Sequence, residues 1–323
     1  MLNTQASPGV FPSVIDSTIR ADFVSCPTKF YWSHCRQIGP SARSVDLIAG
    51  GAFARGLEVT RRTFWGKGKP FSQSLDEGMA AAIAEWGDFV ITDPKKENKS
   101  LERVISALGE YFIQWPIKTD PIQPYFWDEG KPAVEYTFAI PLPILHPVTN
   151  EPLIYAGRLD LIGIFNAQVF LVDEKTTSQL GPTWGEKWNL RSQFTGYAWA
   201  ARHTGLPVAG AIVRGISFLK NSFGFAQSIQ FRPQWQVERW YEQLVFDIEA
   251  MKSYWLAGRF PQNLADSCES YSGCPFMRLC ESSTPEDWMS SYSPRAWNPL
   301  DRYPSGKPAQ EAGELTPLGF TLT

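Results

Sequence analysis

The sequence lacks a long apolar run, a signal-like start and any large set of cysteines or histidines. No uncharged hydrophobic stretch in its 323 residues approaches the roughly 20 residues needed to span a bilayer. Its first residues contain neither a basic nor an apolar region of the kind that directs secretion. These absences predict a protein without membrane spans and with a cytoplasmic location. Cysteines number five, and an odd count in a chain of this length argues against a disulfide framework.

An excess of basic charge is also missing, since the formal net charge is −3. Two segments nevertheless carry a local net charge of +5. Residues 14–70 hold nine Lys/Arg against four acids, and residues 175–220 hold six against one. A basic groove is therefore compatible with an acidic chain, although scattered solvated charges would give the same counts. No phosphate-binding loop of the G-x-x-x-x-G-K-[ST] type is present, so any nucleic-acid unwinding would need a partner.

Hydrophobic periodicity predicts helices in the first third of the chain and in two later segments. We expect helices over 14–40, from Gly50-Gly51 to Arg62, over 75–90 and 101–115, over about 190–203, and from Pro233 to about 257. Between them lie runs rich in β-branched and aromatic residues, which predict strands within 134–142, 153–165, 168–176, 208–220 and 224–231. Asn166-Ala167 suits a tight hairpin between the second and third of these strands.

Two acidic residues and a lysine lie on the strands that this hairpin would join. Asp160 belongs to the run LIYAGRLDLIGIF, and Asp173 and Lys175 end the run QVFLVDEKT. Carboxylates on adjacent strands form a hard-oxygen site for Mg²⁺ or Mn²⁺, which the backbone carbonyl of Glu174 would complete. Lys175 shares a strand face with Asp173, where its ammonium group would orient a water or offset charge on a phosphate. The pattern indicates hydrolysis of a phosphodiester.

The order of these motifs resembles the RecB-like branch of the PD-(D/E)XK nucleases. In that family an Asp-ending strand precedes a D-x-K strand and a Q-x-x-x-Y helix, here Gln193 to Tyr197. The resemblance implies a restriction-endonuclease-like α/β fold, with a central mixed sheet flanked by helices. It also implies metal ligation by Asp160 and Asp173, a catalytic Lys175, and support of the site by Gln193 and Tyr197. Glu135 matches an acid that often begins the preceding strand, although a surface charge on an edge strand is the alternative.

One family feature is incomplete. The family often has an early helix reading G-x-x-x-H-x-x-x-E, whose histidine contributes to the metal site. Here Glu58 fits the acid, but Ala54 stands at the histidine position, and the histidines of the chain, His34, His146 and His203, lie elsewhere. The missing ligand predicts weaker metal binding, a changed metal preference or lost activity.

Cysteine spacing adds a second motif. Cys268, Cys274 and Cys280 fall within thirteen residues near the end, and Cys26 lies near the start. Thiolates suit zinc or an iron–sulfur cluster, and zinc ribbons usually use closer C-x-x-C pairs. The arrangement resembles iron–sulfur RecB-like nucleases, including the family associated with CRISPR adaptation. It implies a 4Fe–4S cluster on these four cysteines, which would join the two ends of the domain, while Cys35 is read as a core thiol.

These observations predict one nuclease domain over 14–283, with a helical insertion at about 70–130 and the Cys cluster near its C-terminal end. Residues 284–323, rich in Pro, Ser and Gly, are expected to form a flexible tail or docking arm. The leading hypothesis is a metal-dependent DNA exonuclease of recombination, repair or phage replication. It would act on single-stranded DNA or single-stranded ends, on which Trp32, Trp65, Trp184 and Trp188 would stack. The alternatives are a catalytically weakened DNA-binding subunit of a larger complex with a helicase or recombination protein, and an iron–sulfur electron carrier.

Overall fold

Two compact units make up the chain in a computed structural model that describes residues 8–127, 130–264, 266–269 and 273–302. Unit 1 comprises Met1–Ala42, Thr137–Gly157 and Glu238–Thr323, and unit 2 comprises Arg43–Tyr136 and Arg158–Val237. Both units are therefore discontinuous in sequence. Among the described residues, no helix combines the length and the apolar character needed to cross a bilayer.

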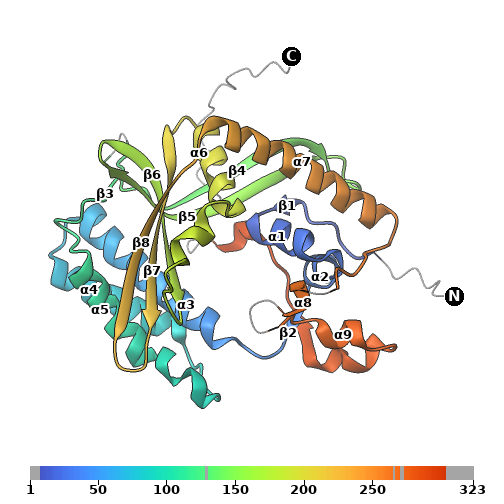
Figure 1. Ribbon diagram of the computed structural model, residues 1–323, viewed down its shortest axis with the longest axis horizontal. Coiled ribbons are helices and arrows are strands. Elements are labelled where there is room, and N and C mark those ends of the chain that lie inside the picture. The colour runs from blue at the N-terminus through green and yellow to red at the C-terminus, as the bar shows by residue number, and fades with distance from the viewer. Residues whose placement is uncertain (1–7, 128–129, 265, 270–272, 303–323) are drawn as a thin grey trace. The chain divides into compact units, whose positions relative to one another are not determined.

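A mixed sheet of seven strands is the central element (Figure 1). Its strands pair in the order β1-β5-β6-β7-β8, and β3 and β4 also pair with β5. β5 runs antiparallel to β6, and β6 runs parallel to β7. The strands are β1 (Val14–Ile15), β3 (Gln123–Pro124), β4 (Val134–Leu145), β5 (Pro152–Phe165), β6 (Gln168–Thr177), β7 (Val208–Phe218) and β8 (Phe223–Phe231). The predicted α/β class with a central mixed sheet flanked by helices is confirmed.

The hairpin between β5 and β6 has the turn that the sequence predicts. Asn166 and Ala167 both adopt positive φ values, 48° and 59°, as a two-residue turn of type I′ requires. Phe165 then pairs with Gln168, and the register continues to Leu161 opposite Val172. This register decides which residues of β5 and β6 face each other.

Helices of unit 2 build a large apolar core against β7. The core cluster joins residues of α3 (Val45–Arg61), α4 (Phe71–Trp86) and α5 (Leu101–Gln114) to Ile216 and Phe218 of β7. α6 (Ser192–His203) packs against β6 and β7. Shorter helical turns are η2 (Arg62–Gly66), η3 (Pro94–Lys99) and η4 (Trp184–Trp188). Trp184 of η4 is 4% exposed and lies over Gly215, so it belongs to the core and is not a stacking platform.

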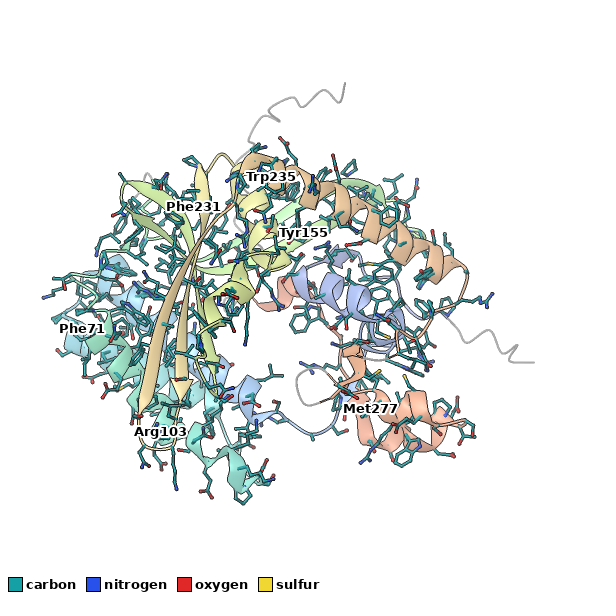
Figure 2. The ribbon with its side chains drawn as sticks, viewed as in Figure 1. Phe71, Arg103, Tyr155, Phe231, Trp235 and Met277 are labelled. Carbon is teal, nitrogen blue, oxygen red and sulfur yellow. The ribbon has the colours of Figure 1, made fainter. Side chains whose placement is uncertain are left out.

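Unit 1 brings the N-terminal and C-terminal segments of the chain together. Its core includes Tyr155 of β5, whose ring lies 5.4 Å from the ring of Trp240 on the long helix α7 (Gln234–Leu256) (Figure 2). β2 (Ile38–Pro40) pairs antiparallel with β9 (Tyr292–Pro294). The remaining elements are α1 (Ser17–Ser25), α2 (Pro27–Phe30), η1 (Tyr31–Cys35), α8 (Asp266–Glu269), α9 (Met277–Glu281), η6 (Pro285–Ser291) and η7 (Pro299–Arg302).

Three of the predicted helices have different limits, and the one expected over 75–90 is α4, at Phe71–Trp86. The helix expected over 14–40 begins with a short strand and is broken at Cys26, whose φ of −163° and ψ of 117° are extended. The proline ring of Pro27 disfavours a helical conformation for the residue before it. The second helix begins at Val45, five residues before Gly50-Gly51, because packing of α3 against α4 overrides the glycine propensity.

Part of the segment for which we predict a tail is described. Residues 285–302 form η6, β9 and η7, and β9 is tied to β2. Residues 303–323 lie outside the described residues. The predicted domain bounds, 14–283 with an insertion at about 70–130, stay a prediction.

The contact between α3 and α4 supplies a test of packing. A Cβ atom on Gly78 of α4 would collide with the Thr60 side chain and lie 2.7 Å from the Gly56 carbonyl oxygen of α3. Gly78→Ala should therefore lower the free energy of unfolding by about 1–3 kcal/mol. Gly109→Ala on α5 is the control, because a Cβ there meets nothing within 4 Å, and it should stabilise by about 0.4–1 kcal/mol. Equal shifts for both variants in urea unfolding would contradict this helix packing.

Candidate active site

The β5–β6 hairpin brings Asp160 and Asp173 together. Leu161 pairs with Val172, so extending the antiparallel register by one residue places the two acids opposite each other on one face. The Asp160 Oδ2 atom accepts a hydrogen bond of 3.1 Å from the backbone N–H of Glu174. Both carboxylates are thus fixed to the same strand pair.

Lys175 lies on the Asp173 face of β6. Its Nζ is 3.0 Å from Asp173 Oδ1 and 2.7 Å from Oδ2, and it lies 5.8 Å from the ring centroid of Phe194 on α6. Burial opposes the charged form of this lysine, but the Asp173 and Asp160 carboxylates outweigh burial and raise its pKa above the ordinary value. The ammonium group is therefore held charged beside the two acids.

α6 presents the predicted polar pair. Gln193 Nε2 donates a hydrogen bond of 3.2 Å to Tyr197 Oη, as expected for residues four apart on a helix. The negative form of Tyr197 would interact with Lys175, which places this pair beside the lysine. The five motif residues that the sequence orders along the chain, Asp160, Asp173, Lys175, Gln193 and Tyr197, are therefore neighbours in space.

Glu135 lies in β4 with an unusual backbone. Its φ of 54° is left-handed, a conformation that costs a residue with a side chain about 1–2 kcal/mol. Such strain is concentrated at functional positions. The side chain is only 6% exposed and its Oε2 is 2.7 Å from Arg158 Nε. The alternative that Glu135 is a surface charge is therefore wrong, because its carboxylate is buried.

Glu58 is buried on α3, one turn after Ala54. Arg55 of α3 and Arg62, the first residue of η2, reach its two carboxylate oxygens at 2.7 and 3.1 Å. None of the histidines compensates for Ala54. His34 and His146 belong to unit 1, and the ring of His203 stacks on Trp199 of α6 at 5.2 Å.

Mutual repulsion and burial shape the titration of these acids. Burial, together with the charges of Asp173 and Glu174, raises the pKa of Asp160 to about 7. Burial likewise raises the pKa of Glu135 to about 8, with added repulsion from Asp160 and Glu58. The pKa of Asp173 is also raised, mainly by burial. The electrostatics therefore couple Glu58, Glu135, Asp160 and Asp173, which we call the carboxylate cluster.

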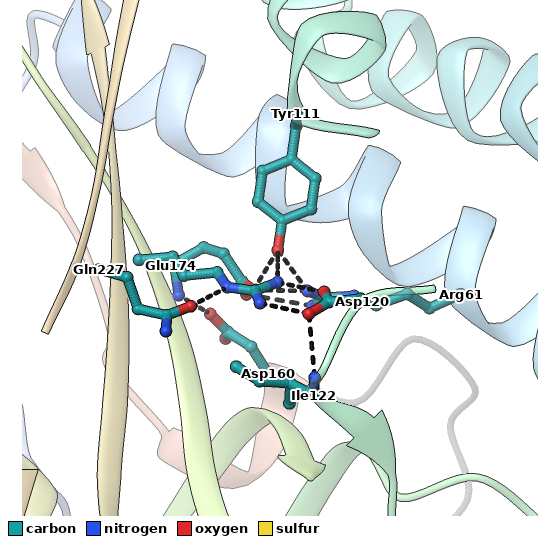
Figure 3. Close-up of polar contacts among 8 residues, drawn as sticks. Arg61, Tyr111, Asp120, Ile122, Asp160, Glu174 and Gln227 are labelled. Carbon is teal, nitrogen blue, oxygen red and sulfur yellow. Dashed lines mark hydrogen bonds and ion pairs between the residues drawn. The ribbon is translucent and has the colours of Figure 1, made fainter. Parts of the chain in front are cut away.

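The middle residue of the Asp-Glu-Lys triplet points to the other face of β6. Glu174 accepts hydrogen bonds from Arg61 Nη1 of α3 at 3.1 Å and from Tyr111 Oη of α5 at 2.9 Å (Figure 3). Burial would raise its pKa, but the Arg61 charge outweighs burial and lowers it. The sequence analysis considers only the carbonyl of Glu174 and misses this side chain.

A second buried ion pair continues the network. Arg214, opposite Glu174 on β7, donates two hydrogen bonds of 2.6 Å to Asp120 and one of 3.1 Å to Tyr111. Only one signal in the sequence points to it. An arginine inside the apolar run VAGAIVRGISF needs a buried partner, but the run does not identify Asp120.

A family comparison matches this arrangement. The family model described as the PD-(D/E)XK nuclease superfamily matches residues 19–281. The chain belongs to this superfamily. Membership in a nuclease superfamily implies a hydrolase that acts on phosphodiester bonds.

Solved structures give weaker likenesses. A crystal structure described as "Putative exonuclease" from Eubacterium rectale is 12% identical, covering 80% of this chain and 88% of that chain with a TM-score of 0.45. The structure of SSO0001 is 13% identical, covering 72% and 84% with a TM-score of 0.30. No curated protein matches the sequence.

PD-(D/E)XK nucleases typically use divalent metal ions, and the donor chemistry of the carboxylate cluster fits one. Its ligand atoms are hard oxygens, and Glu58 Oε1, Glu135 Oε2 and Asp173 Oδ2 are buried without a hydrogen bond. Within the described residues, no three His, Cys, Asp or Glu side chains converge closely enough to hold a metal ion. The match between this cluster and a divalent metal ion therefore rests on the charge and the burial of its carboxylates.

Four cysteines form a group in unit 1. Burial, together with the neighbouring Cys274, Cys26 and Cys268, raises the pKa of the Cys280 thiol to about 11. The same neighbours Cys26 and Cys268 act on Cys274. Cys35 is buried, with a pKa raised to about 12 by burial alone. The four thiols predicted as ligands are thus mutual neighbours, and Cys35 stands apart from them.

The raised pKa values predict how metal-free protein responds to pH. Asp160 and Glu135 are neutral in the folded state up to about pH 7 and 8, but ionise near pH 4 when unfolded. The stability that these neutral carboxyl groups contribute to the folded state is fully present below about pH 4 and is lost as pH rises through about 7 and 8. Asp160→Asn should therefore raise the free energy of unfolding at about pH 9, by on the order of 2 kcal/mol, and change it little at about pH 4.

Thermal unfolding in a chelating buffer across this pH range measures the effect. Asp88→Asn is the control, because Asp88 is 97% exposed and should leave the pH profile of the wild type unchanged. An Asp160→Asn profile parallel to that of the wild type would show that the Asp160 carboxyl is not held neutral in the folded protein.

Proposed function

We propose that this protein is a divalent-metal-dependent DNA nuclease, with Asp160, Asp173 and Lys175 as its central residues. The observation that carries the proposal is the end of the β5–β6 register at Leu161 opposite Val172, next to which Asp160 accepts a hydrogen bond from the Glu174 N–H and Lys175 lies beside Asp173. In this assignment Asp160, Asp173 and the Glu174 carbonyl hold Mg²⁺ or Mn²⁺. Such an ion, when bound, lowers the pKa of a water and neutralises charge on the phosphate.

Lys175 contributes a fixed positive charge at the reacting phosphate. Its ammonium group can donate three hydrogen bonds, of which Asp173 accepts part. The remaining capacity is available to orient an attacking water or to offset charge on the phosphate in the transition state. Gln193 and Tyr197 would support this lysine or contact the DNA backbone.

Glu58 and Glu135 complete the proposed site as outer acids. Glu135 raises the negative charge around Asp160, since each carboxylate disfavours ionisation of the other. A divalent cation would relieve this repulsion. The unusual backbone of Glu135 supports a functional position because no packing need for it is evident.

Substitutions that keep the shape of the site test the catalytic assignment. Asp160→Asn, Asp173→Asn and Lys175→Met should each reduce cleavage of end-labelled DNA by about 100-fold or more in Mg²⁺ and Mn²⁺. Asp88→Asn, which alters an exposed ion pair with Arg43, should cut like the wild type. Wild-type rates for all three site variants would refute the assignment.

A second candidate function is a catalytically weakened DNA-binding subunit of a larger nuclease or recombination complex. Ala54 favours it, because the helix that carries Glu58 lacks the histidine of the family pattern. Wild-type protein that binds DNA but leaves every end-labelled single- and double-stranded substrate intact, in either metal, would support this candidate over the first.

We further propose the RecB-like, iron–sulfur subtype, with exonuclease action on single-stranded DNA or ends in recombination, repair or phage replication. Cys26, Cys268, Cys274 and Cys280 would bind a 4Fe–4S cluster, whose donors are thiolates. All four lie in unit 1, with Cys26 in its N-terminal segment and the others in its C-terminal one. The nuclease domain would span 14–283. Separation of DNA strands would require a helicase partner.

Metal analysis tests the cluster. Anaerobically purified protein should be brown with about four irons per chain. Cys26→Ser, Cys268→Ser, Cys274→Ser or Cys280→Ser should each remove the iron and lower the midpoint of thermal unfolding, because the cluster closes a long loop. Cys35→Ser is the matched control and should keep the iron. Zinc, or no metal, after expression with sufficient iron would overturn the subtype.

A further inference from the structure

Three arginines cover the carboxylate cluster from its exposed side. Arg55 and Arg62 contact Glu58, and Arg158 contacts Glu135. The arginine side chains are 33%, 46% and 32% exposed, whereas the side chains of Glu58 and Glu135 are 3% and 6% exposed. These arginines, which we call the arginine rim, therefore lie between buried negative charge and solvent.

Arg62 and Arg158 of the rim lie close to carboxylate oxygens, but these contacts do not have the geometry of hydrogen bonds. Glu58 Oε1 lies 3.1 Å from Arg62, and Glu135 Oε2 lies 2.7 Å from Arg158. Neither oxygen accepts a hydrogen bond, although both are buried. The attraction is thus mainly that of opposite charges, which does not fix one partner in the way that aligned hydrogen bonds do.

Arg214 shows what a structural arginine looks like in the same unit. It is 1% exposed and makes two aligned hydrogen bonds of 2.6 Å to Asp120. Its guanidinium is enclosed and satisfied. Arg62 and Arg158 lack this burial, and their contacts with Glu58 Oε1 and Glu135 Oε2 lack this alignment, so these two carboxylate contacts are exchangeable.

Charge balance indicates what would take their place. When all four acids of the carboxylate cluster are ionised, as binding of a cation requires, they carry four negative charges, and Arg55, Arg62, Arg158 and Lys175 carry four positive charges. A divalent cation added to this balanced set leaves a surplus of two positive charges. An anion with several acceptor oxygens, such as a phosphodiester, would restore the balance and match the fork of a guanidinium.

We propose that the arginine rim exchanges its partners: Arg62 and Arg158, assisted by Arg55, neutralise Glu58 and Glu135 when no divalent cation is bound, and bind nucleic-acid phosphates when a cation takes the carboxylates. The inference rests on the proposed nuclease function, because it needs both a cation and a phosphate ligand at this site. It makes the two ligands mutually supportive, since each favours the state that binds the other.

Calcium alone tests the first half. Ca²⁺ is a hard cation with the same oxygen preference, and its binding is measured by calorimetry without DNA. Arg62→Gln and Arg158→Gln remove a competing cation and should tighten Ca²⁺ binding roughly two- to fivefold. Arg43→Gln is the matched control, because Arg43 pairs with exposed Asp88, and should leave Ca²⁺ binding unchanged.

Binding of a labelled single-stranded oligonucleotide tests the second half. In Ca²⁺, Arg62→Gln and Arg158→Gln should each weaken binding and reduce the slope of log affinity against log salt by about 0.7. Without Ca²⁺ these variants should bind as weakly as the wild type. Arg158→Lys keeps the charge, and should restore the wild-type Ca²⁺ affinity with part of the DNA affinity. It also serves if Arg158→Gln fails to fold.

If the arginine rim exchanges partners, the glutamine variants bind Ca²⁺ more tightly but bind the oligonucleotide in Ca²⁺ more weakly. Unchanged or weaker Ca²⁺ binding in both glutamine variants, or unchanged DNA binding in Ca²⁺, would overturn the proposal. Its failure is distinct from failure of the nuclease assignment. The calcium titration does not depend on cleavage, whereas the nuclease assignment fails if wild-type protein leaves DNA uncut in Mg²⁺ and Mn²⁺.

Discussion

The cost of burying carboxylates beside one another is the constraint on which this site depends. Each ionised carboxylate removed from water needs compensation by hydrogen bonds or opposite charge. Glu174 has both, from Arg61 and Tyr111. Glu58, Glu135 and Asp173 have opposite charges nearby but keep oxygens without hydrogen bonds. The protein thus satisfies one acid of the hairpin region and leaves the others in need of a cation, which is the condition that a metal-dependent hydrolase requires.

Side chains alternate between the two faces of β6, and this alternation separates the satisfied carboxylate of Glu174 from the unsatisfied one of Asp173. Asp173 and Lys175 project toward α6, while Glu174 between them projects toward α3 and α5. The buried hydrogen bonds of the Glu174 side chain hold the strand that carries Asp173 and Lys175, and the backbone N–H of Glu174 also donates to Asp160. A substitution of Glu174 would therefore disturb the site without removing any residue that faces it. Such a substitution would affect cleavage by shifting the positions of Asp160, Asp173 and Lys175.

Local patterns were sufficient to predict the five long strands, β4 to β8, the hairpin turn and the motif residues that lie on β5 and β6. Asn166-Ala167 and the flanking apolar runs define the register, which runs to Leu161 opposite Val172, next to Asp160 and Asp173. The pairing of Arg214 with Asp120 was not predictable in this way, because its partners are distant in sequence and each looks like an ordinary charged residue locally. The left-handed backbone of Glu135 also leaves no local signal, since nothing in AVEYTF calls for it. Tertiary packing, not propensity, likewise fixes the start of α3.

The alanine at position 54 takes its meaning from the arginines around Glu58. A histidine one turn before Glu58 would offer a neutral ligand and would not compete for that carboxylate. In this chain Arg55 and Arg62 occupy both oxygens of Glu58 instead. A cation entering the cluster therefore gains one ligand fewer and must displace two guanidinium groups. Metal binding that is weak alone but reinforced by a phosphate ligand follows from this arrangement, because the displaced guanidinium groups need an anion and the substrate of a nuclease supplies one.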